Sequence, residues 1–269
     1  MKKITEFYQS LWHDYILIAP QAEKIHQLFT ATDGLVINDH VAFRTFANTP
    51  VSLEKLESVI FSLGYERQDS YQFKEKKLSA HSYIHADSHT PKIFCSELLT
   101  DQLSEASQAI IARYTDQISE ATELSPELFW SGRHWQAPSW DDYQQVLAES
   151  EYGAWLLALG LRVNHFTVSV NHLKSSHSVE EVLYRVKQAG YGVNTSGGEV
   201  KGSPEALLEQ GSTMADKVTV LFAGDDAHEI PTCFYEFARR YPDPDNANKL
   251  YQGFREANAD KIFESTNVS

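Results

Sequence analysis

The stretch DHVAFRTF, residues 39–46, decides how the remainder of this chain is interpreted. Its β-branched and aromatic side chains predict a β-strand. Because side chains alternate between the two faces of a strand, His40, Ala42 and Arg44 share one face. Imidazole is the commonest metal ligand, and the guanidinium group recognises carboxylates through a planar fork of donors. Taken alone, the stretch is explained equally well by an edge-strand histidine beside a surface arginine.

The pattern around His40 occurs a second time in the chain. Residues 162–170 (RVNHFTVSV) predict another β-branched strand, and His165 lies near its start. Each of the two strands precedes an apolar helical stripe that ends at a Gly-Tyr pair, which begins at Gly64 in the first copy and at Gly190 in the second. Each copy then ends with a strand that follows a proline. A repeat of this length, with matching strand, helix and turn residues, predicts two βαβββ units.

A glutamate in the last strand of the second unit completes a candidate metal site. Glu236 lies within the apolar run CFYEFA, residues 233–238, where a carboxylate is costly to bury unless it is paired or bound to a metal. Two histidines and one carboxylate that leave coordination positions open suit non-haem Fe(II) and dioxygen chemistry. The corresponding glutamate of the first unit, Glu97, is displaced by one residue and points to the opposite strand face. We therefore expect one metal site, formed by His40, His165 and Glu236.

Explanations without a metal remain open for these residues. A histidine such as His165 is often a core residue whose nitrogens are satisfied by hydrogen bonds. Glu236 has Arg239 and Arg240 close by in the sequence as ion-pair partners. His134 has no partner in the sequence pattern, and the other histidines lie in polar or turn-like contexts, where we expect surface residues.

The whole chain, residues 1–269, is expected to form a single domain of the α+β class. The two units are expected to form a curled sheet around a shared, metal-containing cavity. Helical periodicity and capping residues predict helices in the segments outside the units. The expected order is N-terminal helices in residues 1–38, the first βαβββ unit in 39–100, a helical insert in 101–160, the second unit in 161–241 and a C-terminal helix in 242–269.

Composition excludes several classes of protein. The 269 residues carry a formal net charge of -14, which argues against nucleic acid or an acidic membrane face as a partner. The N-terminal residues are not typical of a signal peptide, and no apolar stretch is long enough to span a bilayer. Cys95 and Cys233 each lie in an apolar run and are expected to be buried thiols. We expect a cytoplasmic protein.

Three predicted strands together resemble the hallmark segments of the DUF1338 family. They are HVAFR at residues 40–44, VNHFT at 163–167 and FYEF at 234–237, and the resemblance extends from about residue 5 to 265. The characterised activity of that family is 2-oxoadipate dioxygenase/decarboxylase, and its fold is related to the vicinal oxygen chelate superfamily. The resemblance implies that His40, His165 and Glu236 bind Fe(2+) and that Arg44 contacts a substrate carboxylate.

The resemblance also implies a reaction and its partners. A small 2-oxo acid would bind the iron through its carboxylate and keto oxygen, and O2 would be the second substrate. For 2-oxoadipate the products would be 2-hydroxyglutarate and CO2, a step of lysine catabolism. Because oxidative decarboxylation supplies the electrons, no external 2-oxoglutarate would be needed. A homo-oligomer is compatible with this function.

Three other functions are compatible with the same residues. The first is a non-oxidative hydrolase, lyase or isomerase, because the same ligands accept zinc, nickel or manganese. The second is a binding module whose metal site is vestigial. The third is a structural repeat protein with polar core histidines, which explains the repeat but not why Arg44 and Glu236 lie on the strand faces of their expected partners.

Overall fold

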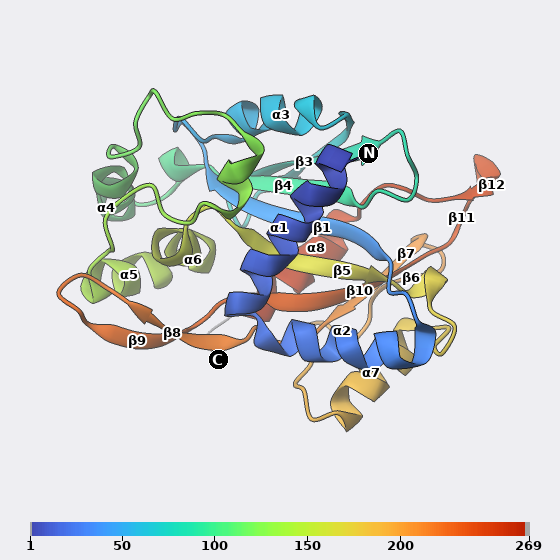
Figure 1. Cartoon of the computed structure of the whole chain (residues 1–269). Helices are drawn as coiled ribbons and strands as arrows, with labels where there is room; N and C mark the ends of the chain where they lie inside the picture. Colours follow the sequence, from blue (N-terminus) through green and yellow to red (C-terminus); the bar gives the residue numbers. More distant parts are fainter. Residues whose placement is uncertain (1, 267–269) are drawn as a thin grey trace.

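The computed structural model describes residues 2–266, and its centre is one mixed β-sheet (Figure 1). The strands are β1 (Asn38–Phe46), β2 (Tyr65–Phe73), β3 (Leu78–His85), β4 (Lys92–Leu98), β5 (Val163–Ser169), β6 (Lys201–Ser203), β7 (Leu208–Ser212), β8 (Lys217–Leu221), β9 (Ala227–Pro231), β10 (Phe234–Arg240), β11 (Pro242–Asp243) and β12 (Asn246–Leu250). The α-helices are α1 (Lys2–Ile18), α2 (Pro20–Asp33), α3 (Leu53–Ser62), α4 (Glu105–Thr115), α5 (Trp140–Leu147), α6 (Glu151–Leu159), α7 (Val179–Gln188) and α8 (Glu256–Phe263). Short 3₁₀ helices lie at η1 (Thr100–Gln102), η2 (Pro126–Trp130), η3 (Val170–His172) and η4 (Glu264–Thr266).

The order of the strands shows the internal repeat. Within the described residues, the main sheet has eight strands in the order β2-β3-β4-β1-β5-β10-β7-β6. Read outward from its centre, each half has the same arrangement, because β1-β4-β3-β2 corresponds to β5-β10-β7-β6. The two halves join where β1 pairs antiparallel with β5. The predicted pair of βαβββ units is confirmed, with one addition: the β8-β9 hairpin forms a separate two-stranded sheet before β10.

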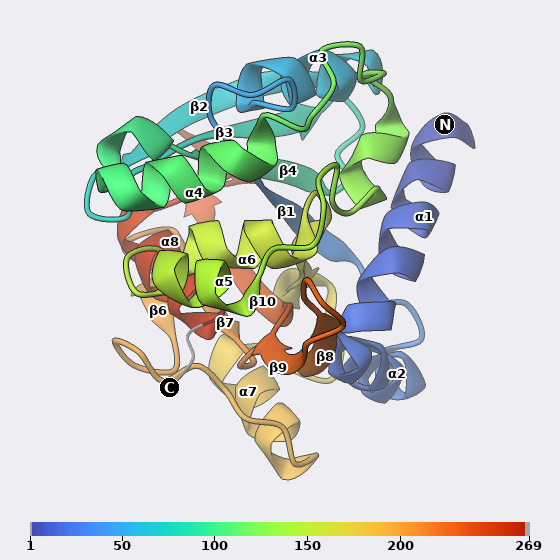
Figure 2. The ribbon, with the colours of Figure 1, turned by 90° about the vertical axis from the view of Figure 1, so that its left-hand side faces the viewer.

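Helices cover both faces of the sheet. Figures 1 and 2 show α1 and α8 on opposite sides of it. The side chains of β1 from Asp39 to Phe46 are all buried, so the polar residues of this strand need hydrogen-bond partners inside the protein. On the α1 side, the rings of Trp12 and Tyr15 lie 5.1 Å from the ring of Phe166 in β5. Because His165 precedes Phe166 in the strand, its side chain points to the opposite, concave face.

Helix α8 closes the concave face of the curled sheet. It contacts β2 at one edge of the sheet and both β6 and β7 near the other edge. Glu256 Oε1 accepts a hydrogen bond from the backbone N–H of Gln72 at 3.1 Å, and Asn258 Nδ2 donates to the carbonyl of Leu208 at 3.2 Å. A flat sheet of this width could not reach one helix from both edges, so the curvature creates an enclosed space beneath α8.

The helical insert consists of α4, α5 and α6 (Figure 2), and α6 contacts β1 of the sheet. Ser104, Ser139 and Ser150 each cap the helix that follows through a side-chain hydrogen bond, so the caps define α4, α5 and α6. The Tyr152 hydroxyl donates to the carbonyl of Ser96 at 2.7 Å and accepts from the N–H of Thr45 at 3.2 Å. The insert is therefore joined to two central strands, β1 and β4.

The prediction of a helix throughout the C-terminal segment is wrong. Residues 242–250 form the β11-β12 hairpin, and α8 begins only at Glu256. The side chain of Arg240 binds the carbonyls of Tyr251 and Gly253, which are no longer available to a helical hydrogen-bond ladder. Local helical periodicity is overridden here by a tertiary contact. The last part of the predicted helix, residues 267–269, lies outside the described residues.

The structure also tests what the sequence predicts about the two cysteines and about membrane-spanning helices. Cys95 and Cys233 are buried free thiols, as predicted. None of the helices within residues 2–266 has both the length and the apolar character that a membrane crossing requires.

Asp33 at the end of α2 joins this helix to the second unit. Its carboxylate accepts hydrogen bonds from the backbone N–H groups of Lys174 and Ser175 and from the Ser175 hydroxyl, at 2.5, 2.8 and 2.6 Å. Burial alone would raise the pKa of Asp33, but these donors lower it to about 2. The ionised carboxylate therefore stabilises the fold above the ordinary carboxyl pKa, and this stabilisation is lost as the pH falls through the folded value.

We expect Asp33→Asn to lower the free energy of unfolding by about 2 kcal/mol at pH 7, the value that corresponds to this pKa difference. The deficit relative to the wild type should shrink between about pH 4 and pH 2, as the wild-type carboxyl becomes protonated. Urea unfolding across this pH range measures it. Asp101→Asn, at an exposed aspartate, is the control and should match the wild type. A deficit that does not depend on pH would contradict the electrostatic explanation.

Candidate metal centre

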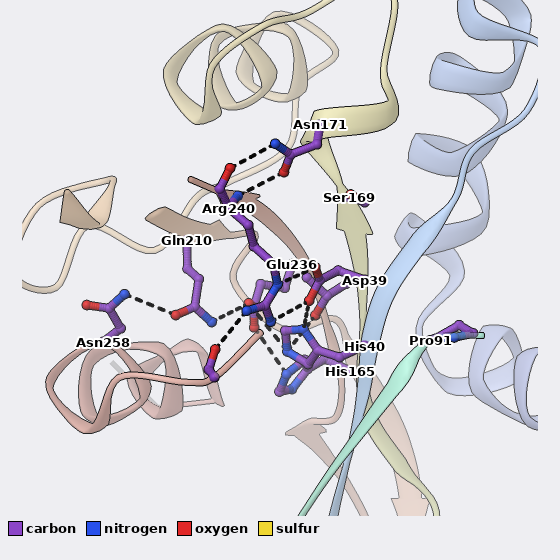
Figure 3. Close-up of polar contacts among 12 residues, drawn as sticks. Asp39, His40, Pro91, His165, Ser169, Asn171, Gln210, Glu236, Arg240 and Asn258 are labelled. Carbon is purple, nitrogen blue, oxygen red and sulfur yellow. Dashed lines mark hydrogen bonds and ion pairs between the residues drawn. The ribbon is translucent and has the colours of Figure 1, made fainter. Parts of the chain in front are cut away.

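The fold brings His40, His165 and Glu236 together on the concave face of the sheet (Figure 3). Glu236 Oε1 lies 3.7 Å from His40 Nε2, and Glu236 Oε2 lies 3.1 Å from His165 Nε2. One potential ligand atom from each residue lies within 4.8 Å of the other two. All three side chains are buried. The predicted ligand set is therefore a single compact cluster.

Strand register explains why these side chains meet. Ala42 of β1 pairs with His165 of β5, and His40 pairs with Thr167. On the other side of β5, Glu236 of β10 also pairs with Thr167. The three residues therefore lie within one short segment of three neighbouring strands at the centre of the sheet, where both repeat units contribute.

Asp39 orients the ring of His40. Asp39 Oδ1 lies 2.8 Å from His40 Nδ1, and Arg240 donates to both oxygens of the same carboxylate. Burial alone would raise the pKa of Asp39, but the charges of Arg240 and Lys92 hold it well below its usual range. An ionised carboxylate only accepts hydrogen bonds, so Nδ1 carries the proton and Nε2 presents its lone pair. The Thr167 hydroxyl, 3.1 Å from Nε2, is its donor in this structure.

Asn164 has the same role for His165. Asn164 Oδ1 lies 2.9 Å from His165 Nδ1, and an amide oxygen can only accept, so Nε2 of His165 again faces the cluster as a lone-pair donor. Burial lowers the pKa of His165, against the opposing effect of Glu236. A neutral imidazole is the form that binds a metal.

Glu236 supplies the negative charge of the cluster. Its Oε1 accepts from Gln210 Nε2 at 2.7 Å, whereas Oε2 is buried and accepts no hydrogen bond from any residue within the described range. Burial alone would raise the pKa of Glu236, but positive charge at His40 and His165 and the Gln210 hydrogen bond lower it, so the ionised carboxylate is favoured when the cluster carries positive charge. A buried anionic oxygen that faces two imidazole lone pairs needs a cation for compensation. The donor set therefore fits a divalent metal ion bound by His40, His165 and Glu236.

Arg44 lies in the wall of the cavity next to this cluster. The cavity is narrow, with a volume of ≈ 30 Å³, and its polar wall includes the three cluster residues, Asn164, Gln210, Ser96 and Arg44. The aromatic part of the wall consists of Phe43, Phe94, Phe254 and Phe263. As predicted, Arg44 and His40 share one strand face and one cavity. A more open groove between α1 and residues 87–91 lies on the other face of the sheet and contains none of the cluster residues.

The guanidinium of Arg44 is only partly paired. Nη1 lies 3.1 Å from Glu151 Oε1, and Nη2 donates to Thr266 Oγ1 at 3.1 Å. The rings of Tyr152 and Trp155 lie 4.8 and 5.1 Å from its central carbon, which favours a cation there. Its Nε is buried and donates to none of the residues that the structure describes. This edge of the guanidinium is suited to an anionic acceptor inside the cavity.

Several residues of this site were not identified from the sequence. Asp39 and Asn164 had a local signal, because each immediately precedes one of the two histidines in its repeat unit. Glu151, Thr266 and Gln210 had none, since they come from the insert, the C-terminal segment and β7. The alternative pairing of Glu236 with Arg240 is not formed, because Arg240 binds Asp39.

The sequence and the structure both have close counterparts among known proteins. The profile of the 2-oxoadipate dioxygenase/decarboxylase family matches residues 14–129 and 127–243. A relative from Oryza sativa subsp. japonica, named 2-oxoadipate dioxygenase/decarboxylase, chloroplastic/amyloplastic, is 36% identical over 94% of this chain and 75% of its own length.

Two crystal structures have the same fold. The hydroxyglutarate synthase of Oryza sativa in complex with 2-oxoadipate is 33% identical and has a TM-score of 0.90, over 99% of this chain and 94% of that one. A protein from Shewanella frigidimarina NCIMB 400, described as a putative hydrolase, is 48% identical and has a TM-score of 0.88, over 94% and 98% of the two chains. The resemblance of the three strand segments is thereby confirmed, and this chain belongs to the 2-oxoadipate dioxygenase/decarboxylase family.

Proposed function

We propose that this protein is a metal-dependent dioxygenase that decarboxylates a 2-oxo dicarboxylic acid, with 2-oxoadipate as the substrate. The observation that carries the proposal is a buried pair of complementary sites in one cavity. At one end are two imidazole lone pairs and a carboxylate oxygen without a hydrogen bond among the described residues. At the other is a buried arginine with an unused donor. Membership of the family and the 2-oxoadipate complex of the rice relative support this substrate.

The proposed reaction needs no additional reductant. 2-Oxoadipate and O2 contain together the same atoms as 2-hydroxyglutarate and CO2. The bond between the carboxyl carbon and the keto carbon breaks, and the keto carbon takes up one oxygen atom to become the new carboxylate. A C–H bond of the neighbouring CH2 group is replaced by C–OH with the second oxygen atom. Each of these two oxidations supplies two of the four electrons that O2 requires. A bound Fe(2+) would supply the Lewis acidity and one-electron chemistry that O2 requires. His40, His165 and Glu236 would hold it and leave the remaining coordination positions open.

The protein's own side chains would bind and orient the substrate. Along β1 the Cα atoms of His40 and Arg44 are separated by roughly 13 Å, and their side chains line one cavity. A substrate whose 2-oxo acid end lies at the cluster would place its second carboxylate toward the Nε edge of Arg44. The Phe94, Phe254 and Phe263 rings exclude water from the carbon chain between them, which strengthens the charged contacts at both ends.

Oxygen uptake tests the proposal. Anaerobically Fe(2+)-loaded protein should consume O2 on addition of 2-oxoadipate and release an equal amount of CO2, with 2-hydroxyglutarate as the organic product. The metal-free and Zn(2+)-loaded proteins are the controls and should show no uptake, because zinc has no redox chemistry. Demonstrated iron binding without uptake for 2-oxoadipate or for shorter and longer 2-oxo acids would reject the dioxygenase.

A non-oxidative metal-dependent hydrolase is the second candidate. It is favoured by the description of the Shewanella frigidimarina relative as a putative hydrolase, and the same ligands would bind zinc, nickel or manganese. In that case the Zn(2+)-loaded protein should be active without O2, which the controls above detect. The cytoplasm remains our expected location for either enzyme.

A further inference from the structure

Arg240, which has no place in the function proposed above, forms an unusually complete set of contacts beside the metal centre (Figure 3). It is the last residue of β10, and only 3% of its surface is exposed. Its side chain makes four hydrogen bonds, two to the Asp39 carboxylate and one each to the carbonyls of Tyr251 and Gly253. The backbone of Arg240 is held as well. Its N–H donates to Asn171 Oδ1, and Asn171 Nδ2 donates to its carbonyl.

The first pair of contacts acts on His40. Arg240 Nε and Nη2 donate to Asp39 Oδ2 and Oδ1 at 2.7 and 2.9 Å, and Asp39 accepts from His40 Nδ1 at 2.8 Å. The planar guanidinium group of Arg240 binds both oxygens of Asp39 and so fixes the orientation of the carboxylate. A fixed carboxylate behind a metal-binding histidine determines the direction of the Nε2 lone pair and raises the basicity of the ring.

The second pair acts on the cavity wall. The carbonyls of Tyr251 and Gly253, at 3.0 and 2.7 Å from Nη1, flank the segment that leads into Phe254. The guanidinium carbon lies 5.2 Å from the centre of the Phe254 ring. That ring meets the ring of His40 edge-on, with 4.8 Å between the ring centroids. One side chain therefore holds both the histidine and the aromatic ring that packs against it.

The other histidine has no such support. Asn164 contacts Nδ1 of His165 through Oδ1, whereas its Nδ2 is buried and has no hydrogen-bond partner among the described residues. The two histidines of the cluster are thus supported differently, one by an ion pair joined through two hydrogen bonds and one by a neutral amide.

We infer that Arg240 is a positioning residue of the metal centre, acting through Asp39 on His40 and linking this ligand to the wall at Phe254. The inference rests on the metal-binding part of the proposed function but not on its substrate or on O2. Lysine cannot replace arginine in this role, because an ammonium group is a point charge that cannot form the fork and reach both carbonyls.

Co(2+) affinity of the full chain tests the inference, and Arg240→Lys is the variant that keeps the charge. We expect its Co(2+) dissociation constant to rise by about 10- to 100-fold, with a changed visible absorption spectrum of the bound Co(2+). Asp39→Asn keeps the shape of the side chain and should give the same direction of change if Arg240→Lys does not fold. Arg67→Lys, at the arginine–glutamate fork with Glu57 remote from the cavity, is the matched control and should bind Co(2+) like the wild type.

Melting temperatures separate positioning from general stability. A merely structural role would lower the melting temperature of the metal-free protein and leave the Co(2+)-dependent increase unchanged. The positioning role predicts a smaller Co(2+)-dependent increase in the melting temperature of the variant, because the size of this increase depends on the Co(2+) dissociation constant. Wild-type affinity and spectrum in Arg240→Lys would overturn the inference. Co(2+) binding by the wild type without O2 uptake of the iron-loaded protein would reject only the dioxygenase, whereas absence of Co(2+) binding by the wild type would reject both.

Discussion

Glu236→Gln is expected to abolish metal retention and turnover while the protein remains folded. The substitution keeps the shape of the side chain and an oxygen that accepts from Gln210, whose Nε2 lies 2.7 Å from Oε1. It removes the negative charge that faces the two imidazoles at 3.7 and 3.1 Å. A divalent cation in a buried site depends on that charge, since two neutral imidazoles do not compensate it. His165→Ala should have the same effect, because it removes one ligand outright.

The measurements are metal content after gel filtration, O2 uptake, and the melting temperature of the metal-free protein. Turnover should fall below detection in both variants. The metal-free Glu236→Gln protein should melt at or above the wild-type temperature, since an uncompensated buried charge is removed. Glu97→Gln is the matched control from the other repeat unit. Its carboxylate accepts from the N–H of Leu53 at 3.0 Å, and we expect unchanged metal content. Wild-type metal content in Glu236→Gln would remove this residue from the site.

Arg44→Ala is expected to weaken binding of a dicarboxylic substrate by about 1.5–3 kcal/mol, the range for hydrogen bonds to a charged group, or about 10- to 150-fold. The physical reason is the buried Nε of Arg44, which donates to none of the described residues. A substrate carboxylate would complete its hydrogen bonding in a region from which three aromatic rings exclude water. The loss should appear mainly in KM for 2-oxoadipate.

A comparison of substrates distinguishes this role from a structural one. 2-Oxohexanoate has the same carbon chain but a methyl group in place of the second carboxylate. Arg44→Ala should raise KM for 2-oxoadipate much more than for 2-oxohexanoate, so the preference of the wild type for the diacid should disappear. Equal losses with both substrates would mean that Arg44 only supports the cavity, through Glu151 and Thr266. Arg44→Lys keeps the charge without the fork and should be intermediate.

The sequence predicted the arrangement of the sheet because its signals are local. Alternation along a strand places His40 and Arg44 on one face, and the repeat of strand, helix and Gly-Tyr turn places His165 in the equivalent strand of the second unit. Helix caps are local signals of the same kind, and the side chains of Ser139 and Ser178 cap α5 and α7. Glu236 was identifiable as a candidate because a carboxylate is rare in an apolar strand.

Local signals failed in the C-terminal segment. Leu250, Phe254 and Ala257 have helical spacing, but only Ala257 lies within α8. The backbone at Tyr251 and Gly253 is held instead by Arg240 of β10. A hydrogen bond to another strand leaves no periodic pattern within the segment itself, so the local sequence cannot predict it.

The amino-acid sequence by itself determined which residues are candidates for a metal site and on which strand faces they lie, because side-chain alternation and helix capping act over a few neighbouring residues. The tertiary structure alone decided what surrounds them. Glu151 and Thr266 reach Arg44 from 107 and 222 residues away in the chain, and Arg240 reaches Asp39 across 201 residues. Such contacts form only when the sheet curls and α6 and α8 close over its concave face, since packing of distant elements, and not local propensity, brings these groups within hydrogen-bond distance.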